Sequence, residues 1–231
     1  MASADPPHGH APFAARWMSA CLASAVALAF ALLAPGQATA AEQTAQTTRL
    51  TASQSADSAI PADPQDWLYW RGPEFNGVSR ATGLLDEFDA RGGDGSNVAW
   101  KRTDVGGRST PVVMDGRLYT LCRAEAGTKH EGERVVCIDA VTGQDVWEFR
   151  FNVYSSDVPD TRVGWSAVTA DPETGSVYAL GVCGLFFCLD ARTGEVRWSV
   201  PLHVRYGLLS TYGGRANLPL VGGEGVLIGA G

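Results

Sequence analysis

The chain has 231 residues, of which 45% are hydrophobic, and its formal net charge at pH 7 is −7. A chain of this length and composition can bury a sizeable core, in one large or two small domains. The acidic balance, with no basic run, argues against nucleic-acid binding, because that binding needs clustered Lys and Arg to displace counterions from phosphates.

Residues 1–40 have the features of a signal peptide. Arg16 precedes fifteen apolar or small residues, ACLASAVALAFALLA at 20–34, and ATA at 38–40 supplies a small-residue cleavage site. Fifteen residues are short for a bilayer span, which takes about 20. We therefore expect an exported protein, periplasmic or extracellular, with no stable membrane span after cleavage. An uncleaved N-terminal anchor is the alternative.

The next segment, 41–65, is rich in Thr, Ala, Ser, Gln and Asp and carries few large apolar side chains. Such a composition cannot bury enough apolar surface to offset the entropy of ordering the chain. The sequence predicts a disordered linker here, followed by one domain over 66–231.

That domain contains an internal repeat. IDAVTGQDVW at 138–147 returns as LDARTGEVRW at 189–198, 51 residues later. Around each copy, short apolar or alternating runs are separated by turn residues. Four short strands at a period near 50 residues are typical of a β-propeller blade. The sequence therefore predicts an all-β fold of four-stranded blades.

The predicted strands divide into one outer strand and about two and a half blades. NVAWKRT at 97–103 is the outer strand. Complete blades are predicted at 109–150 and 165–200, and the start of a third at 217–231. A closed ring takes roughly four to eight blades, so we expect a C-terminally truncated part of a longer chain.

The repeated phrase has a structural interpretation. Each Asp ends a strand and can accept backbone N–H bonds of the turn, the Thr hydroxyl can do the same, and the Gly permits a positive φ. Each Trp lies on an outer strand, where its ring can cover the turn of the neighbouring blade. This docking motif comprises Trp100, Asp139, Thr142, Gly143, Trp147, Asp190, Thr193, Gly194 and Trp198.

The pattern Asp-Ala-x-Thr-Gly-x-x-x-Trp resembles the tryptophan-docking motif of PQQ-like, or quinoprotein-type, β-propeller repeats. WLYWRGPEFNGVS at 67–79, the stretch at 161–190 and STYGGRANLPLV at 210–221 resemble a secreted bacterial branch of that family. The resemblance covers 67–231. It implies a fold shared by PQQ-dependent alcohol dehydrogenases, by an outer-membrane assembly lipoprotein that binds no quinone, and by secreted members of unassigned role.

Loops between blades gather on one face of a propeller, and varied loops on a rigid scaffold commonly carry binding sites. Arg108, Arg162 and Arg215 each precede an innermost strand by three to five residues. A ring of guanidinium groups there could hold a carboxylate-rich ligand through bidentate hydrogen bonds, with Trp165 and Tyr212 stacking beside it. In the alternative, these arginines bond loop carbonyls and the aromatic rings fill gaps between blades.

The cysteines allow two interpretations. Cys122 and Cys137 would face each other across a symmetric hairpin over 117–139, and an exported protein could join them as a disulfide. Cys137 and Cys188, however, hold equivalent repeat positions, which favours small buried core residues. No Cys or His spacing indicates zinc or haem attachment, and we expect no metal site.

Three functions follow. The favoured one is a non-catalytic binding or scaffold module that uses its inter-blade loops to bind a protein, a polysaccharide or a small anionic ligand. The resemblance also implies a PQQ- and calcium-dependent alcohol dehydrogenase, for which Asp157 and Asp160 with Trp165 are the only candidate loop residues. The third is an envelope assembly scaffold. Enzymatic activity is less favoured than binding, and no cofactor is demonstrable from the sequence.

Overall fold

The structure is a computed structural model that describes residues 59–61, 63–153, 162–207, 217–223 and 225–229, all within the compact unit Ala41–Gly231. The predicted signal peptide at 1–40 and most of the predicted linker lie outside these residues. Within the described ranges, no helix is both long and apolar enough to cross a membrane.

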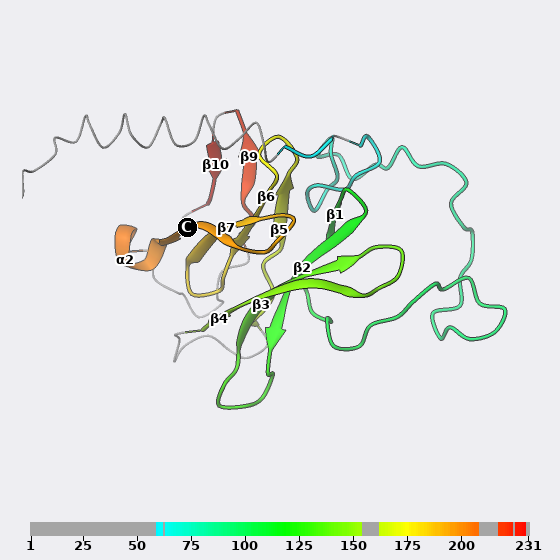
Figure 1. Ribbon diagram of the computed structural model, residues 1–231, viewed down its shortest axis with the longest axis horizontal. Coiled ribbons are helices and arrows are strands. Elements are labelled where there is room, and N and C mark those ends of the chain that lie inside the picture. The colour runs from blue at the N-terminus through cyan, green and yellow to red at the C-terminus, as the bar shows by residue number, and fades with distance from the viewer. Residues whose placement is uncertain (1–58, 62, 154–161, 208–216, 224, 230–231) are drawn as a thin grey trace, which may run out of the picture. The chain divides into compact units, whose positions relative to one another are not determined.

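Two four-stranded antiparallel sheets follow one another along the chain, and each keeps its strands in sequence order (Figure 1). The first blade consists of β1 (Val112–Met114), β2 (Arg117–Ala124), β3 (Gly132–Asp139) and β4 (Asp145–Asn152). The second consists of β5 (Val168–Asp171), β6 (Ser176–Leu180), β7 (Leu185–Asp190) and β8 (Val196–Pro201). The all-β fold of four-stranded blades is confirmed.

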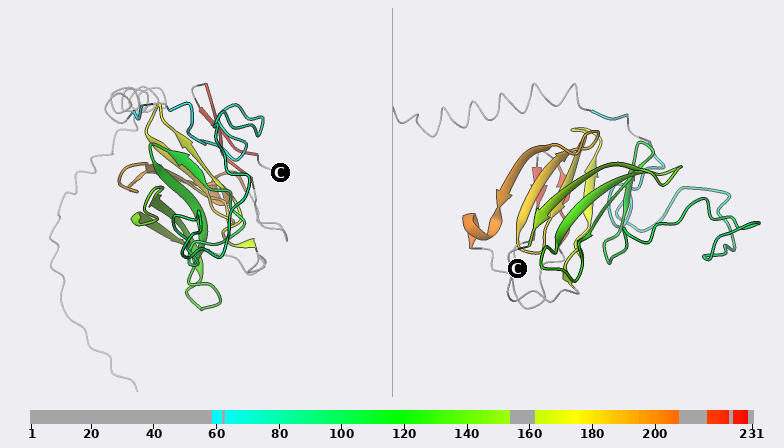
Figure 2. Two further views of the ribbon diagram at one scale, coloured as in Figure 1. Left: turned by 90° about the vertical axis from the view of Figure 1, so that its right-hand side faces the viewer. Right: turned by 60° about the horizontal axis from the view of Figure 1, so that its bottom comes forward.

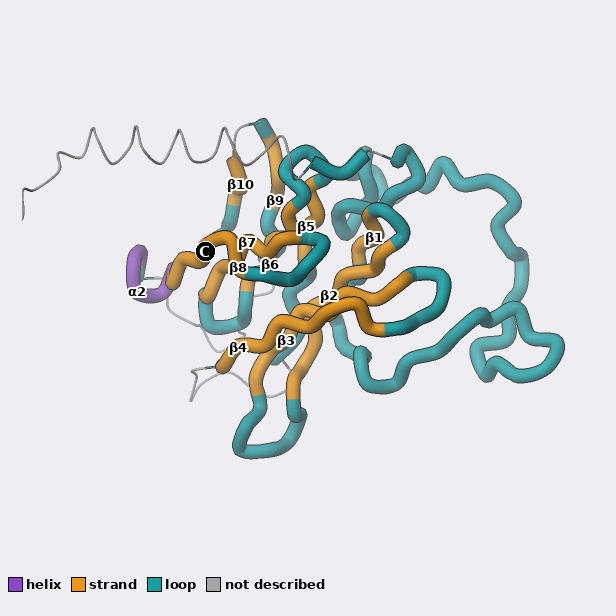
Figure 3. The backbone as a smooth tube through the Cα atoms, viewed as in Figure 1, coloured by secondary structure: helices purple, strands orange, loops and turns teal. Residues whose placement is uncertain are grey.

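Two smaller elements complete the described part. The short helix α2 (Leu202–Tyr206) follows β8 and ends at Gly207, which has a left-handed φ of 62°. The strands β9 (Leu220–Gly222) and β10 (Gly225–Leu227) form a two-stranded antiparallel sheet (Figure 3). They fall within the segment predicted to begin a third blade.

The main core lies between the two blades, whose sheets face each other (Figure 2). The first blade contributes residues such as Tyr119 and Leu121, and the second contributes Val177 and Leu189, all fully buried. A second cluster lies on the opposite face of the second blade, where Tyr178 and its neighbours pack against side chains from the β9–β10 segment. Each blade therefore buries its faces against adjacent units, as stacked repeats do.

Trp100, which precedes the first blade, and Trp147, on β4, each contact the Asp-Ala-x-Thr-Gly turn of the blade that follows. The Trp147 indole Nε1 donates to the Ala191 carbonyl at 3.1 Å, and Trp100 Nε1 donates to the Ala140 carbonyl at 3.0 Å. Gly194 has a φ of +77°, and a Cβ atom placed there would lie 2.6 Å from the Trp147 ring. Only glycine combines this backbone conformation with such a close approach.

The turn itself is closed by its aspartate. Asp139 Oδ1 accepts hydrogen bonds from the Thr142 backbone N–H at 2.7 Å and from the Thr142 hydroxyl at 2.8 Å. These bonds favour the ionised carboxylate and lower the pKa of Asp139. The Asp190 carboxylate accepts the Thr193 backbone N–H in the same way, at 3.0 Å.

Both blades interrupt their ladder at the same place. Cys137 pairs with Trp147 but Ile138 pairs with Asp145, so Val146 is an extra residue on β4. In the second blade, Cys188 pairs with Trp198 and Leu189 with Val196. A β-bulge of this kind bends its strand and increases the local twist, and here it lies directly before each tryptophan.

The cysteine pairing predicted from the hairpin is wrong. Cys122 lies opposite Arg134 and Cys137 lies opposite Tyr119, so pairing the cysteines would require a register shifted by three residues. Since successive side chains on a strand point to opposite faces, Cys137 joins the core between the blades and Cys122 packs on the other face. Both are free thiols, and burial raises the pKa of Cys122 and raises that of Cys137 to about 12.

The outer strand predicted at 97–103 is also wrong, because this segment adopts no strand conformation. None of the strands in the described ranges pairs with it, and a single extended segment has no ladder in which to satisfy its backbone groups. Side chains hold it instead. Besides the Trp100 contact, Arg102 bridges Asp104 at 2.6 Å and Asp145 at 2.9 Å.

The predicted linker extends too far toward the C-terminus. Ile60 is 5% exposed and belongs to the core between the blades. Its backbone N–H donates to the Pro172 carbonyl at 2.8 Å. One isolated isoleucine in a polar stretch gives little sequence signal, yet its side chain fills a place in the core.

Candidate ligand site on the loop face

The segment that leads into the second blade brings three of the predicted site residues together. The Arg162 guanidinium carbon lies 3.6 Å from the centroid of the Trp165 ring, and that of Arg108 lies 4.6 Å from it. Arg108 precedes β1 and Arg162 precedes β5, so the two arginines occupy corresponding places in consecutive blades. Tyr212 and Arg215, the other two predicted residues, lie outside the described residues.

This arrangement concentrates positive charge at one aromatic ring. Guanidinium groups are attracted electrostatically to the face of an indole ring. Arg108 is exposed, whereas Arg162 and Trp165 are half-buried. Because Arg162 lies so close to the ring, its guanidinium group covers one face of the indole. The cluster offers planar donors to a carboxylate or phosphate.

A buried glutamate fixes the loop that carries this cluster. Glu133, on β3, is 1% exposed. Its Oε1 accepts the backbone N–H of Gly164 at 2.8 Å, and its Oε2 accepts that of Val182 at 2.9 Å. One carboxylate thus ties the first blade to two loops of the second, and Gly164 is the residue directly before Trp165. Burial raises the pKa of Glu133 to about 7.

The loop also depends on a close backbone approach at Gly164. This glycine has a φ of +69°, and a Cβ atom there would lie 2.7 Å from the backbone nitrogen of Arg123. A side chain at this position would force the loop away from β2. The positions of Arg162 and Trp165 therefore follow from backbone packing on both sides of the seam.

Sequence reasoning missed Glu133. In the repeat alignment it corresponds to Gly184, so the repeat itself gives no signal, and a glutamate near the start of an alternating strand resembles a solvated residue. Its carboxylate packs against the turn after β6: a Cβ atom placed on Gly181 would lie 2.8 Å from Glu133 Oε2 and 2.5 Å from the Phe151 ring. These neighbours are distant in sequence, and no local pattern identifies them.

The residues required for a PQQ-dependent dehydrogenase are not assembled in the described part of the chain. That chemistry needs calcium ligands, a catalytic carboxylate and a stacking tryptophan. No group of three or more His, Cys, Asp or Glu side chains in the described ranges could hold a metal ion. Both oxygens of Glu133 are occupied by backbone donors, and Asp157 and Asp160 lie outside the described residues.

Comparison with solved structures finds partial matches with low sequence identity. A europium-containing methanol dehydrogenase matches with a TM-score of 0.46 and 14% identity over 78% of this chain and 29% of that chain. The quinohemoprotein alcohol dehydrogenase ADHIIG of Pseudomonas putida matches with a TM-score of 0.48 and 20% identity, over 79% of this chain and 24% of that chain. The quinohemoprotein alcohol dehydrogenase of Comamonas testosteroni matches with a TM-score of 0.46 and 23% identity, over 78% of this chain and 27% of that chain. The chain thus spans less than a third of each of these structures.

The family comparison is more extensive along the sequence. No curated protein matches the chain significantly. The family of PQQ-like repeats described as "Outer membrane protein assembly factor BamB" matches residues 81–202 and, in an overlapping copy, 131–228. These matches cover more than half of the chain and include both four-stranded blades. The chain is therefore a member of this PQQ-like β-propeller repeat family.

Proposed function

We propose that this protein is a non-catalytic binding module that takes an anionic ligand on its inter-blade loop face, at Arg108 and Arg162. The observation that carries the proposal is the convergence of these two guanidinium groups on the Trp165 ring. Arginine guanidinium groups bind carboxylates and phosphates through charge-assisted hydrogen bonds in a planar, bidentate geometry, which supports an anion as the ligand of this cluster. The signal-like sequence at 1–40 supports export of this module to the periplasm or the cell exterior.

Isothermal titration calorimetry of the full chain with citrate tests the proposal. Arg108→Gln and Arg162→Gln should each weaken citrate binding by roughly ten-fold, because each removes one charge-assisted contact. Arg91→Gln is the matched control, since its side chain is 94% exposed and its nearest carboxylate, Asp89, is 3.8 Å away. Equal citrate affinity in all three variants, or no citrate binding by the parent protein, would exclude the site.

The same titration distinguishes the dehydrogenase alternative. PQQ is also a polycarboxylate, so the binding site proposed here would take it without calcium and without any reaction. Saturable PQQ binding that requires Ca²⁺, together with alcohol-dependent dye reduction, would replace the binding module with a quinoprotein dehydrogenase.

The family match favours an envelope assembly scaffold as the second candidate function, because the family description names an outer membrane protein assembly factor. Such a scaffold would bind other envelope proteins and would keep them when citrate is added. Co-purification of envelope proteins with the chain, unaffected by citrate, would support this candidate over the anion site.

A further inference from the structure

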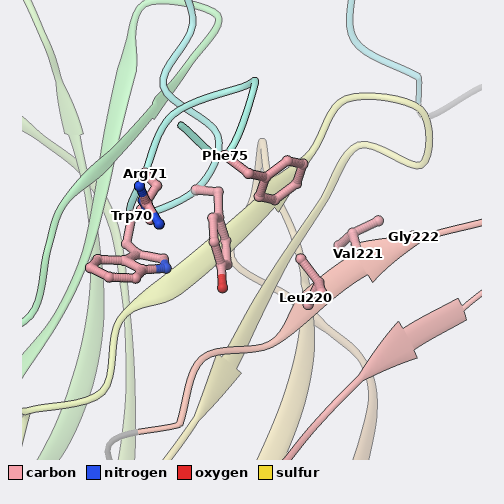
Figure 4. Close-up of a pocket in the computed structure, with 7 residues that line it drawn as sticks. Trp70, Arg71, Phe75, Leu220, Val221 and Gly222 are labelled. Atoms are coloured by element: carbon pink, nitrogen blue, oxygen red, sulfur yellow. The ribbon is translucent and has the colours of Figure 1, made fainter. Parts of the chain in front are cut away.

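A second site lies beside the innermost strands, formed by a segment that precedes the first blade. The backbone of Trp67 pairs with Val113 of β1, and the Leu68 carbonyl accepts the Ala170 N–H of β5. Residues of this segment and of β9 line an open, shallow cavity of about 470 Å³ (Figure 4). The residues that line it are Tyr69, Trp70, Arg71, Phe75, Leu220, Val221 and Gly222.

Aromatic rings dominate this cavity and remain accessible. Trp70 and Phe75 are each 46% exposed. The Tyr69 ring is near both, with its centroid 6.3 Å from that of Trp70 and 4.9 Å from that of Phe75. Half-exposed rings grouped in this way mark interaction sites more often than isolated surface hydrophobics do.

The rings are fixed in place by a tight turn. The Gly72 N–H donates to the Tyr69 carbonyl at 2.8 Å, and the Gly77 N–H donates to the Arg71 carbonyl at 2.9 Å. Phe75 adopts a φ of +55°, which an aromatic residue rarely occupies. Strained backbone of this kind is concentrated at functional sites, where the fold holds a side chain in a set position.

The polar groups of the cavity define the charge of its ligand. Among the described residues that line it, Arg71 is the charged one, and its guanidinium carbon lies 5.7 Å from the centroid of the Trp70 ring. The Trp70 indole N–H and the Tyr69 hydroxyl are further donors. A complementary ligand therefore presents flat apolar faces to the rings, many oxygen acceptors to the donors, and a negative charge to Arg71.

We propose that this cavity binds an acidic oligosaccharide, a chain of sugar rings that carry carboxylates. The C–H faces of a sugar ring would pack on Trp70 and Phe75, while its carboxylate would meet the Arg71 guanidinium. A small dicarboxylate would leave the aromatic faces unused, and a neutral sugar would leave the charge of Arg71 unmatched. This site is separate from the arginines of the loop face and does not rest on their proposed function.

Calorimetry of the full chain with tetragalacturonate tests this proposal, with cellotetraose as the neutral counterpart and citrate as the probe of the loop face. Trp70→Ala and Arg71→Gln should each weaken tetragalacturonate binding by roughly ten-fold. Trp70→Phe, which keeps a ring, should recover much of the affinity. Phe88→Ala removes an aromatic side chain that is 71% exposed elsewhere on the surface and should change nothing.

A urea midpoint equal to that of the parent protein establishes that a variant is folded. If Trp70→Ala does not fold, Trp70→Phe and Arg71→Gln supply the test of the site. Binding of cellotetraose as tight as that of tetragalacturonate would overturn the acidic class. Loss of tetragalacturonate binding in Arg108→Gln, rather than in Arg71→Gln, would move the ligand to the loop face. No binding of either oligosaccharide would overturn the site, and binding of an aromatic-rich peptide instead would assign it to a protein partner.

Discussion

The Glu133 carboxylate is almost completely buried, and both of its oxygens accept backbone N–H groups of the second blade. Its pKa of about 7 in the folded protein lies above its ordinary value of 4.5. The folded state therefore binds more protons than the unfolded state between these pH values. By linkage, the contribution of Glu133 to the free energy of unfolding is largest below about pH 4.5 and is lost as pH rises through about 7.

Glu133→Gln should remove this pH dependence. The parent protein is expected to lose about 3 kcal/mol of stability through Glu133 as pH rises from about 4.5 to above 7. The variant lacks this ionisation, although its amide leaves one backbone N–H without an acceptor and lowers stability at every pH by about 1–3 kcal/mol. Urea unfolding at a series of pH values between about 5 and 8 measures both effects.

The exposed Glu195 provides the control for this measurement. Glu195→Gln should keep the slope of the parent protein, and an unchanged slope in Glu133→Gln would assign the pH dependence to other groups. Carboxylates with a lowered pKa do not interfere. Asp104, for example, has a pKa of about 2 beside the Arg102 guanidinium, so its ionisation changes only at much lower pH.

At the scale of elements, a turn of one blade and a strand of its neighbour are coupled through Trp147 and Gly194. Gly194→Ala should destabilise the protein through two effects: the left-handed backbone, at about 1–2 kcal/mol, and displacement of the Trp147 ring, which a Cβ atom would approach to 2.6 Å. Gly116→Ala is the matched control. Gly116 has a similar φ of +68° with no atom within 4 Å of such a Cβ.

A double-mutant cycle separates the two effects. In a Trp147→Ala background, the cost of Gly194→Ala should fall to that of Gly116→Ala, which gives a coupling energy of about 1–2 kcal/mol. Urea unfolding of the four proteins provides the values. Strictly additive effects would mean that the indole and the turn do not act together.

The elements also show what the sequence can and cannot predict. Turn residues and alternating runs are local, so the eight strands of the two blades follow from the repeated pattern. The segment at 97–103 has an equally good pattern, but a strand exists only beside a partner, and that partner is not encoded within the segment. The pairing of Cys122 with Cys137 failed for a different reason: the hairpin pairs Arg117 with Asp139 as expected, and that register places Cys122 opposite Arg134 rather than opposite Cys137.

The candidate site also contains residues that the sequence could predict and residues that it could not. Arg108, Arg162 and Trp165 could be brought together from sequence because their distances from the innermost strands place them at one end of the blades. Glu133 could not be found, since its environment is made by residues of the following blade. The aromatic cavity could not be predicted, because it depends on how residues 67–75 run past β1 and β5 to β9, and no pattern within those residues reveals that path.

At the scale of the whole molecule, the two blades share one core. The Phe187 ring lies 5.0 Å from the Phe149 ring and 4.8 Å from the Phe151 ring across the seam. The Tyr119 hydroxyl of the first blade donates to the Ala191 carbonyl of the second at 3.1 Å. Because each blade buries a face against the other, we expect neither to keep its protected structure when the seam is lost.

Phe187→Ala should therefore destabilise both blades together, by about 3–4 kcal/mol. Hydrogen exchange in increasing urea measures this by residue. The amides of β2 and β3 in the first blade should lose protection at the same urea concentration as those of β6 and β7 in the second, and both should shift equally in the variant. Val141→Ala, at a side chain 78% exposed, should shift neither. If the first blade kept its protection in Phe187→Ala, its stability would come from its own sheet, and the repeat would be a chain of independent units rather than a coupled one.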